Sequence, residues 1–211
     1  MDLHLWLAFF AASWAISLSP GAGAVAAMSA GLNHGFRHGY FLTFGLVLGI
    51  VAQVAVVGLG LGALIATSAI AFALVKWVGV AYLIYLGVKQ WRAPAQPLVQ
   101  GAAEGAPSVT RRQLVLRGWM VNAVNPKGTV FLLAVVPQFL VLTKPLAPQY
   151  LAIGATLAFT DLVVMAGYTL LAARALRLLR SPRSLRAMNK TFGGLFVAAG
   201  VFLGTMKRAG G

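Results

Sequence analysis

Two charged side chains lie inside apolar stretches of this chain, and both could do chemistry there. Asp161 is one of three carboxylates in the 211 residues, and Lys127 directly follows a proline. A charge at mid-membrane costs about 2.5–3.5 kcal/mol on insertion scales, so it is expected to face a cavity or a partner. Asp161 could carry a proton or balance a ligand ammonium, and Lys127 could bind a carboxylate. The alternatives are a structural pair between the two charges, or side chains that snorkel to the membrane surface.

Two prolines interrupt apolar stretches at matching places in the two halves of the chain. They lie in Ser19-Pro20-Gly21 and in Asn125-Pro126-Lys127, 106 residues apart. A proline inside a helix removes one backbone hydrogen bond, which frees the carbonyl four residues earlier, here that of Ile16 and that of Asn122. Such paired interruptions are typical of transporter binding sites. The positive helix end after each break, with its free N–H groups, suits a carboxylate.

The predicted ligand site combines both breaks with Asp161 and the side chains near them. Asn122 and Asn125 add amides beside the second break, and the small residues of the first break expose backbone N–H groups. Tyr168 follows Asp161 at helical spacing and therefore shares its face. Asp161 is also the predicted proton-coupling residue. We expect ligand contacts from Ser19, Pro20, Gly21, Gly23, Asn122, Asn125, Pro126, Lys127, Asp161 and Tyr168.

The composition indicates which elements must position these residues. The chain is 60% hydrophobic and 9% charged, with a mean hydropathy of +0.85 and no cysteine, whereas average soluble domains are about a quarter charged. About 20 apolar residues span a bilayer as a helix, and six stretches reach that length. We therefore predict an all-α integral membrane protein with six transmembrane helices, of which the first and fourth are broken. The stretches cover residues 3–31, 40–67, 70–91, 114–142, 151–173 and 187–206.

The six predicted helices divide into two halves of three. Residues 93–111 are rich in proline and glycine in their first part, which predicts a cytoplasmic linker. An odd number of helices on each side of the linker inverts the second half in the membrane and makes a 3+3 inverted repeat. The prediction is one transmembrane transporter domain over residues 1–211, with pseudo-repeats 1–92 and 112–208. Glycine pairs spaced by four, such as Gly45 and Gly49, are predicted to pack helices together.

Seventeen lysines and arginines give a net charge of +14, and their distribution predicts the orientation. Through six helices, twelve of them fall on one face and four on the other, with Lys127 in between. The positive-inside rule assigns the richer face to the cytoplasm, so both termini are predicted to be periplasmic in a bacterial inner membrane. We expect anionic lipid headgroups as partners of this face. Nucleic acid is not expected, because the basic segment 174–190 has no interleaved aromatic residue.

Several short motifs follow one another along nearly the whole chain. They are Ser17-Leu18-Ser19-Pro20-Gly21, Leu32-Asn33-His34-Gly35-Phe36-Arg37, Lys76-Trp77-Val78-Gly79, Ala81-Tyr82-Leu83-Ile84-Tyr85-Leu86-Gly87, Asn125-Pro126-Lys127 and Pro137-Gln138-Phe139. In this order and spacing they resemble the LysE/RhtB family of amino-acid exporters. Ala22 stands where many members carry a second proline, which resembles the homoserine-exporting branch. The resemblance implies export from the cytoplasm, driven by the proton gradient.

The function predicted from the residues and the resemblance is efflux of small neutral amino acids, with homoserine first and homoserine lactone and threonine next. The protein is not expected to be an enzyme or to hold a cofactor. A metal site is not expected either, since His34 and His38 lack a third ligand. One alternative is an exporter of another small solute or an ion, although Asp161 is the only membrane carboxylate. Another is an intramembrane enzyme, which would need a nucleophile with its base, or a metal. Association of copies with one another stays open.

Overall fold

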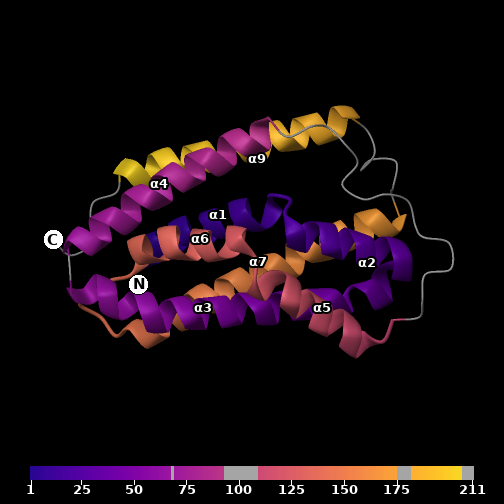
Figure 1. Cartoon of the computed structure of the whole chain (residues 1–211), viewed down its shortest axis with the longest axis horizontal. Helices are drawn as coiled ribbons and strands as arrows, with labels where there is room; N and C mark the ends of the chain where they lie inside the picture. Colours follow the sequence, from indigo (N-terminus) through magenta and orange to yellow (C-terminus); the bar gives the residue numbers. More distant parts are fainter. Residues whose placement is uncertain (68, 93–108, 175–181, 206–211) are drawn as a thin grey trace.

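The computed structural model describes residues 1–67, 69–92, 109–174 and 182–205, and these residues fold into helices (Figure 1). Residues 93–108 of the predicted linker, residues 175–181 and residues 206–211 lie outside this description. In chain order the elements are α1 (Leu3–Leu18), α2 (Ala22–Gly39), α3 (Phe41–Thr67), α4 (Ala69–Trp91), α5 (Arg111–Ala123), α6 (Pro126–Val135), the 3₁₀ helix η1 (Val136–Phe139), α7 (Leu146–Arg174) and α9 (Pro182–Thr205).

Pro20 and Pro126, where helix breaks are predicted, each lie at a sharp bend between two helices. The axes of α1 and α2 differ by 55°, and the α5 axis differs from that of α6 and η1 by 52°. Ser19 and Gly21 on either side of Pro20 have extended backbones, so α1 ends before the proline and α2 begins after it. Asn125 is the extended N-cap of α6, and Pro126 occupies the first helical position, where its missing N–H costs nothing.

Two single helices are long and apolar enough to cross a membrane, α3 over Phe41–Gly60 and α7 over its full length. If each bent pair is one span, the number within the described residues rises to four. The other two predicted apolar stretches are also helical, as α4 and α9. The all-helical membrane fold is therefore confirmed, whereas six spans in a 3+3 inverted repeat stay a prediction.

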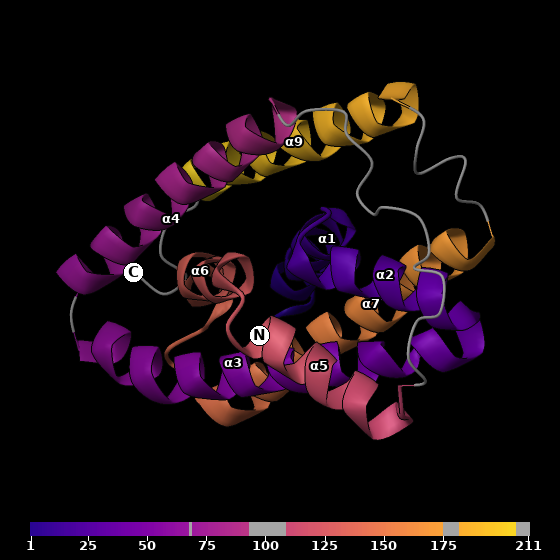
Figure 2. The ribbon, with the colours of Figure 1, turned by 45° about the vertical axis from the view of Figure 1, so that its right-hand side comes forward.

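Close helix contacts through glycine position the elements around the centre of the molecule. A Cβ atom at Gly45 of α3 would collide with the carbonyl oxygen of Val115 on α5, and one at Gly49 would lie 2.7 Å from Cβ of Asn122. The predicted packing role of these two glycines is thereby confirmed. Figure 2 shows α4 and α9 as a second close pair along one side of the bundle. A Cβ at Gly193 of α9 would lie 2.7 Å from the carbonyl oxygen of Gly87 on α4.

Two hydrophobic cores lie next to each other in the bundle. One contains Phe9, Phe139 and Ile153 and joins α1 and α3 to α6, η1 and α7. The other contains Leu46 and Leu114 and joins α2, α3, α5 and α7. Because α3 and α7 contribute to both cores, they form the frame against which the two bent pairs pack.

The start of α1 is tied to the connection that precedes α7. The Lys144 ammonium lies 2.8 Å from Oδ1 of Asp2, and its hydrogen bond and charge hold the pKa of that exposed carboxyl below its usual range. Gln149 accepts from the Val141 N–H and donates to the Val141 carbonyl, which fixes the same connection from within α7. In Figure 1 the start of α1 and the end of α9 lie at the same end of the molecule.

We predict that Gly45→Ala destabilises the contact between α3 and α5. The added Cβ meets a backbone carbonyl that cannot move alone, and overpacking of this kind costs about 1–3 kcal/mol. The melting temperature of the detergent-purified protein should fall by several degrees. Gly60→Ala on the same helix is the matched control, because its Cβ would meet no described atom within 4 Å. Equal melting of both variants would contradict the assigned contact.

Candidate functional site

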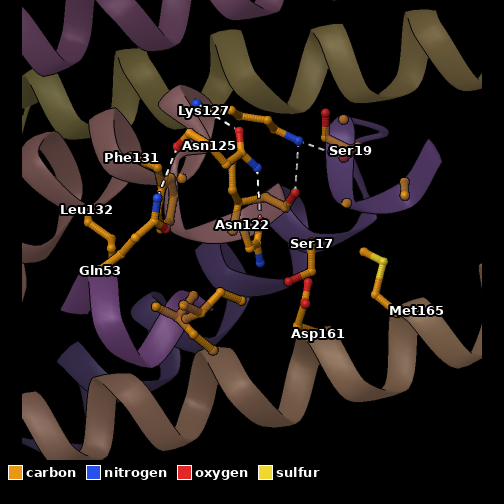
Figure 3. A pocket seen from close by; sticks show the side chains of 17 residues that line it. Ser17, Ser19, Gln53, Asn122, Asn125, Lys127, Phe131, Leu132, Asp161 and Met165 are labelled. Carbon is orange, nitrogen blue, oxygen red and sulfur yellow. Dashed lines mark hydrogen bonds between the residues drawn. The ribbon is translucent and has the colours of Figure 1, made fainter. Parts of the chain in front are cut away.

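A cavity of about 70 Å³ lies where the two bent pairs meet, with walls from both hydrophobic cores (Figure 3). About 10–15 Å³ of such space is enough for one water molecule, so the cavity has room for several waters or for a small ligand. Its apolar walls include Ile50, Phe131, Leu132, Leu157 and Met165. Its polar lining consists of Ser17, Ser19, Gln53, Asn122, Asn125, Lys127 and Asp161.

The first helix break is capped by side chains from the other half of the chain. Lys127 Nζ donates to the Ile16 carbonyl at 3.2 Å and to the Ser19 carbonyl at 2.6 Å. The hydroxyl of Tyr168 donates to the Leu18 carbonyl at 2.6 Å. The carbonyl that Pro20 frees therefore belongs to Ile16, as predicted, and its partner is an ammonium that also faces the negative end of the α1 dipole.

The second helix break is satisfied within its own segment. The Asn122 carbonyl accepts from the Asn125 N–H at 3.0 Å, which closes a turn. The Asn125 side chain accepts from the Lys127 N–H at 3.1 Å and donates to Oδ1 of Asn122 at 3.0 Å. Asn122 donates in turn to the Leu46 carbonyl of α3 at 2.9 Å. The expectation of a free N–H at Lys127 is therefore wrong, because the N-cap asparagine occupies it.

The positive end of α2 is the better anion site of the two breaks. Its N-cap is Gly21, which has no side chain to cap the first N–H groups. The Ser19 hydroxyl is buried and has no hydrogen-bond partner among the described residues. A Cβ at Gly21 would lie 3.5 Å from Nζ of Lys127, so the ammonium stands directly beside the start of α2. Free backbone N–H groups, a hydroxyl and a cation thus converge where a carboxylate could bind.

Asp161 lies on α7 and reaches the cavity from the wall opposite Lys127 (Figure 3). The residue is 6% exposed, and its Oδ2 has no hydrogen-bond partner in the part of the chain that the structure describes. The preceding Thr160 is occupied, because its hydroxyl lies 3.3 Å from that of Ser17 on α1. A buried carboxylate oxygen without a donor is costly unless a cation or a proton meets it, so Asp161 is suited to an ammonium or to proton transfer.

The structure brings most of the predicted site residues together. Pro20, Pro126 and Tyr168 do not line the cavity, although the prolines create the two breaks and Tyr168 caps the first. The cavity is lined by the other predicted residues, which are Ser19, Gly21, Gly23, Asn122, Asn125, Lys127 and Asp161.

Sequence reasoning missed Gln53 of α3, which is buried and lines the cavity. Its Nε2 donates to the Asn125 carbonyl at 3.0 Å and to the Thr129 hydroxyl at 2.8 Å. A signal was present, because Gln53 is the one amide side chain in the apolar stretch 40–67. A polar residue in such a stretch is expected to face the bundle interior.

The fold and the site define a helical membrane translocator with a small polar cavity between two helix breaks. The model of the family of LysE type translocators matches residues 14–207. The chain belongs to this family, which confirms the resemblance seen in the motifs.

Relatives cover the chain from end to end. An uncharacterized membrane protein of Vibrio cholerae is 42% identical over 207 residues, which are 98% of this chain and 100% of the relative. The homoserine/homoserine lactone efflux protein of Salmonella typhi is 40% identical over 209 residues, 99% of this chain and 100% of the relative. A leucine efflux protein of an Enterobacter species is 29% identical over 143 residues, 65% of each chain. No solved structure matches.

We predict that Lys127 and Pro20 are energetically coupled. Lys127→Met should destabilise the protein by about 1.5–3 kcal/mol, the usual contribution of a hydrogen bond to a charged group. In a Pro20→Ala background the cost should shrink, because the new N–H can bond the Ile16 carbonyl as in a continuous helix. A double-mutant cycle of unfolding in detergent measures the coupling.

The control for this cycle is Lys144→Met, which removes an exposed lysine from a surface ion pair. Exposed pairs contribute little, so we expect a small effect that is the same with Pro20 and with Ala at that position. If the Lys127 and Pro20 changes prove additive, the ammonium does not cap the break.

Proposed function

We propose that this protein exports small neutral amino acids from the cytoplasm, with homoserine as the first candidate and homoserine lactone and threonine next. The observation that carries the proposal is the pair of opposite charges on facing walls of one small cavity. Asp161 offers an unpartnered carboxylate oxygen, and Lys127 stands beside the uncapped start of α2. This arrangement is complementary to a zwitterion. Relatives named as homoserine/homoserine lactone and leucine efflux proteins support the same substrate class.

In this proposal the substrate carboxylate binds at the start of α2 and accepts a hydrogen bond from the Lys127 ammonium. The ammonium is held by the Ile16 and Ser19 carbonyls, so an arriving carboxylate competes for a donor that otherwise stabilises the end of α1. Substrate binding would thus change the cap of the first break. A homoserine lactone has no free carboxylate and depends on Asp161 alone. Ser19, Gly21 and Gly23 supply the rest of the carboxylate site, and Asn122 and Asn125 line the cavity beside it.

Asp161 is also the proposed proton carrier. A carboxyl group that exchanges a proton for the substrate ammonium couples the two movements, because both cannot occupy the same oxygens. Among the described residues that line the cavity Asp161 is the one carboxylate, which favours an amino acid over a metal ion, because hard cations need several oxygen ligands. No catalytic role is proposed, and the relatives named as efflux proteins are transporters.

The proposed setting is the bacterial inner membrane, as one domain of six spans in a 3+3 inverted repeat, with residues 93–111 as the cytoplasmic linker. Support comes from the two bent pairs at corresponding places and from the common end at which α1 starts and α9 finishes (Figure 1). Both termini would be periplasmic. The arginine-rich opposite end, which includes Arg111 and Arg174, would contact anionic lipid headgroups.

We predict that Asp161→Asn abolishes proton-driven export of both homoserine and its lactone. The amide keeps the size of the side chain but can neither carry the proton nor balance the ammonium. Uptake of labelled substrate into everted membrane vesicles, with and without an uncoupler, measures the effect. Asp2→Asn makes the same change at an exposed carboxylate and should leave transport intact. Uncoupler-sensitive transport by Asp161→Asn would rule out the proposed role.

We predict that single cysteines label from opposite sides of the membrane. The native chain has no cysteine, so Asp2→Cys and Ser108→Cys can be tested one at a time. In cells with a permeabilised outer membrane, an impermeant maleimide should label Cys at position 2 and not at position 108. Disrupting the inner membrane should expose position 108. Labelling of position 108 in intact spheroplasts would contradict the orientation.

A further inference from the structure

Gln53 lines the cavity, and its side-chain oxygen accepts no hydrogen bond from the described residues. It stands on α3 and is 6% exposed. Its neighbours in the cavity are Gly128, Phe131 and Leu132 of α6, so this wall is formed by α3 and α6. Asp161 belongs to α7, and the Lys127 ammonium, although carried by α6, reaches away from this wall to the Ile16 and Ser19 carbonyls and the start of α2. A substrate that binds through its zwitterion therefore turns its side chain toward α3 and α6.

The orientation of the Gln53 amide is determined by its partners. Nε2 lies 3.0 Å from the Asn125 carbonyl oxygen, which can only accept, and 2.8 Å from the Thr129 hydroxyl oxygen. The Thr129 hydroxyl donates its own hydrogen bond to the Asn125 carbonyl at 3.1 Å, so its oxygen must accept from Gln53. With the amide reversed, Oε1 would face two acceptors. The amide nitrogen therefore points to α6, and Oε1 remains as the free end of the group.

Oε1 of Gln53 is a cavity-lining acceptor that lies beside Gly128. No described residue donates to it, and a Cβ at Gly128 would lie only 2.7 Å from it. Oε1 therefore lies close to the Gly128 backbone, and a methyl group added at Gly128 would collide with it. The surrounding wall is apolar, so a hydrogen bond formed there is shielded from water and an acceptor left unpaired is costly.

We propose that Gln53 is a specificity-determining residue that selects substrates whose side chain carries a hydroxyl group, by accepting a hydrogen bond from that group at Oε1. The inference rests on the proposed export of amino acids. Homoserine and threonine present such a hydroxyl, whereas norvaline and valine have the same shape with a methyl group in its place. A site with a buried acceptor disfavours the methyl isostere, because the isostere leaves the acceptor without a donor.

Everted vesicles that contain the full-length protein provide the test, with initial uptake rates of homoserine and norvaline measured side by side. The parent protein should prefer homoserine by roughly tenfold, the usual effect of one neutral buried hydrogen bond. Gln53→Leu should bring the two rates close together, mainly by lowering homoserine uptake. Homoserine lactone has no hydroxyl group, so its uptake should be retained. Gln138→Leu is the matched control, because Gln138 is equally buried in η1 but does not line the cavity, and it should keep the preference.

A second variant keeps the Gln53 side chain but displaces its amide group. Gly128→Ala places a methyl group against Oε1 and should also reduce the preference for homoserine, so the inference is tested even if Gln53→Leu fails to insert. An unchanged homoserine-to-norvaline ratio in an expressed Gln53→Leu, or in Gly128→Ala, would overturn the inference. Equal transport of both substrates by the parent would also overturn it and leave the proposed function standing. Transport of neither by the parent would overturn the proposed function itself.

Discussion

The centre of this protein depends on one contact. The Lys127 ammonium donates hydrogen bonds to carbonyl groups at the broken end of α1. Pro20 leaves α1 with carbonyl groups that no helical N–H can reach, and in an apolar environment such groups must find a partner. Lys127 of α6 meets the Ile16 and Ser19 carbonyls, and Tyr168 of α7 meets the Leu18 carbonyl. Elements from both halves of the chain are thereby tied to one point. The cavity lies beside that point, since Ile16, Ser19 and Lys127 all line it.

The two breaks resemble each other in bend angle but not in how their polar groups are satisfied. Asn125 caps the start of α6 and closes the turn before it, so the second break needs little from elsewhere. The first break has a glycine N-cap and depends on distant side chains. This difference explains why the start of α2, and not that of α6, remains available to an anion. The two prolines occupy corresponding places in the sequence, but the two breaks differ in the structure. The break at Pro126 is capped by its own segment, whereas the break at Pro20 is suited to a ligand.

Close packing through glycine gives the site its third wall. Gly45 and Gly49 let α3 approach α5 at backbone distance, with no side chain between them. Asn122 then reaches the Leu46 carbonyl, and about two helical turns further along α3 Gln53 reaches the start of α6. The amides of α3, α5 and the turn before α6 form a continuous chain of hydrogen bonds. Such a network holds the wall opposite α7 rigid, because each member is oriented by the next.

The class of fold, the places where the helices break and the two charges inside apolar stretches could all be predicted from the residues alone. These follow from local properties: apolar length, the missing N–H of proline, and the cost of a lone charge at depth. The hydrogen-bond partner of each freed carbonyl group, in contrast, became visible only in the folded arrangement of the helices. The partner of the Ile16 carbonyl lies 111 positions away and that of Gln53 lies 72 positions away. No local rule selects between Lys127 as an anion ligand and Lys127 as a helix cap, since that choice depends on how close α6 comes to α1. Gln53 was missed for the same reason, because its task depends on a neighbour that folding alone brings within reach.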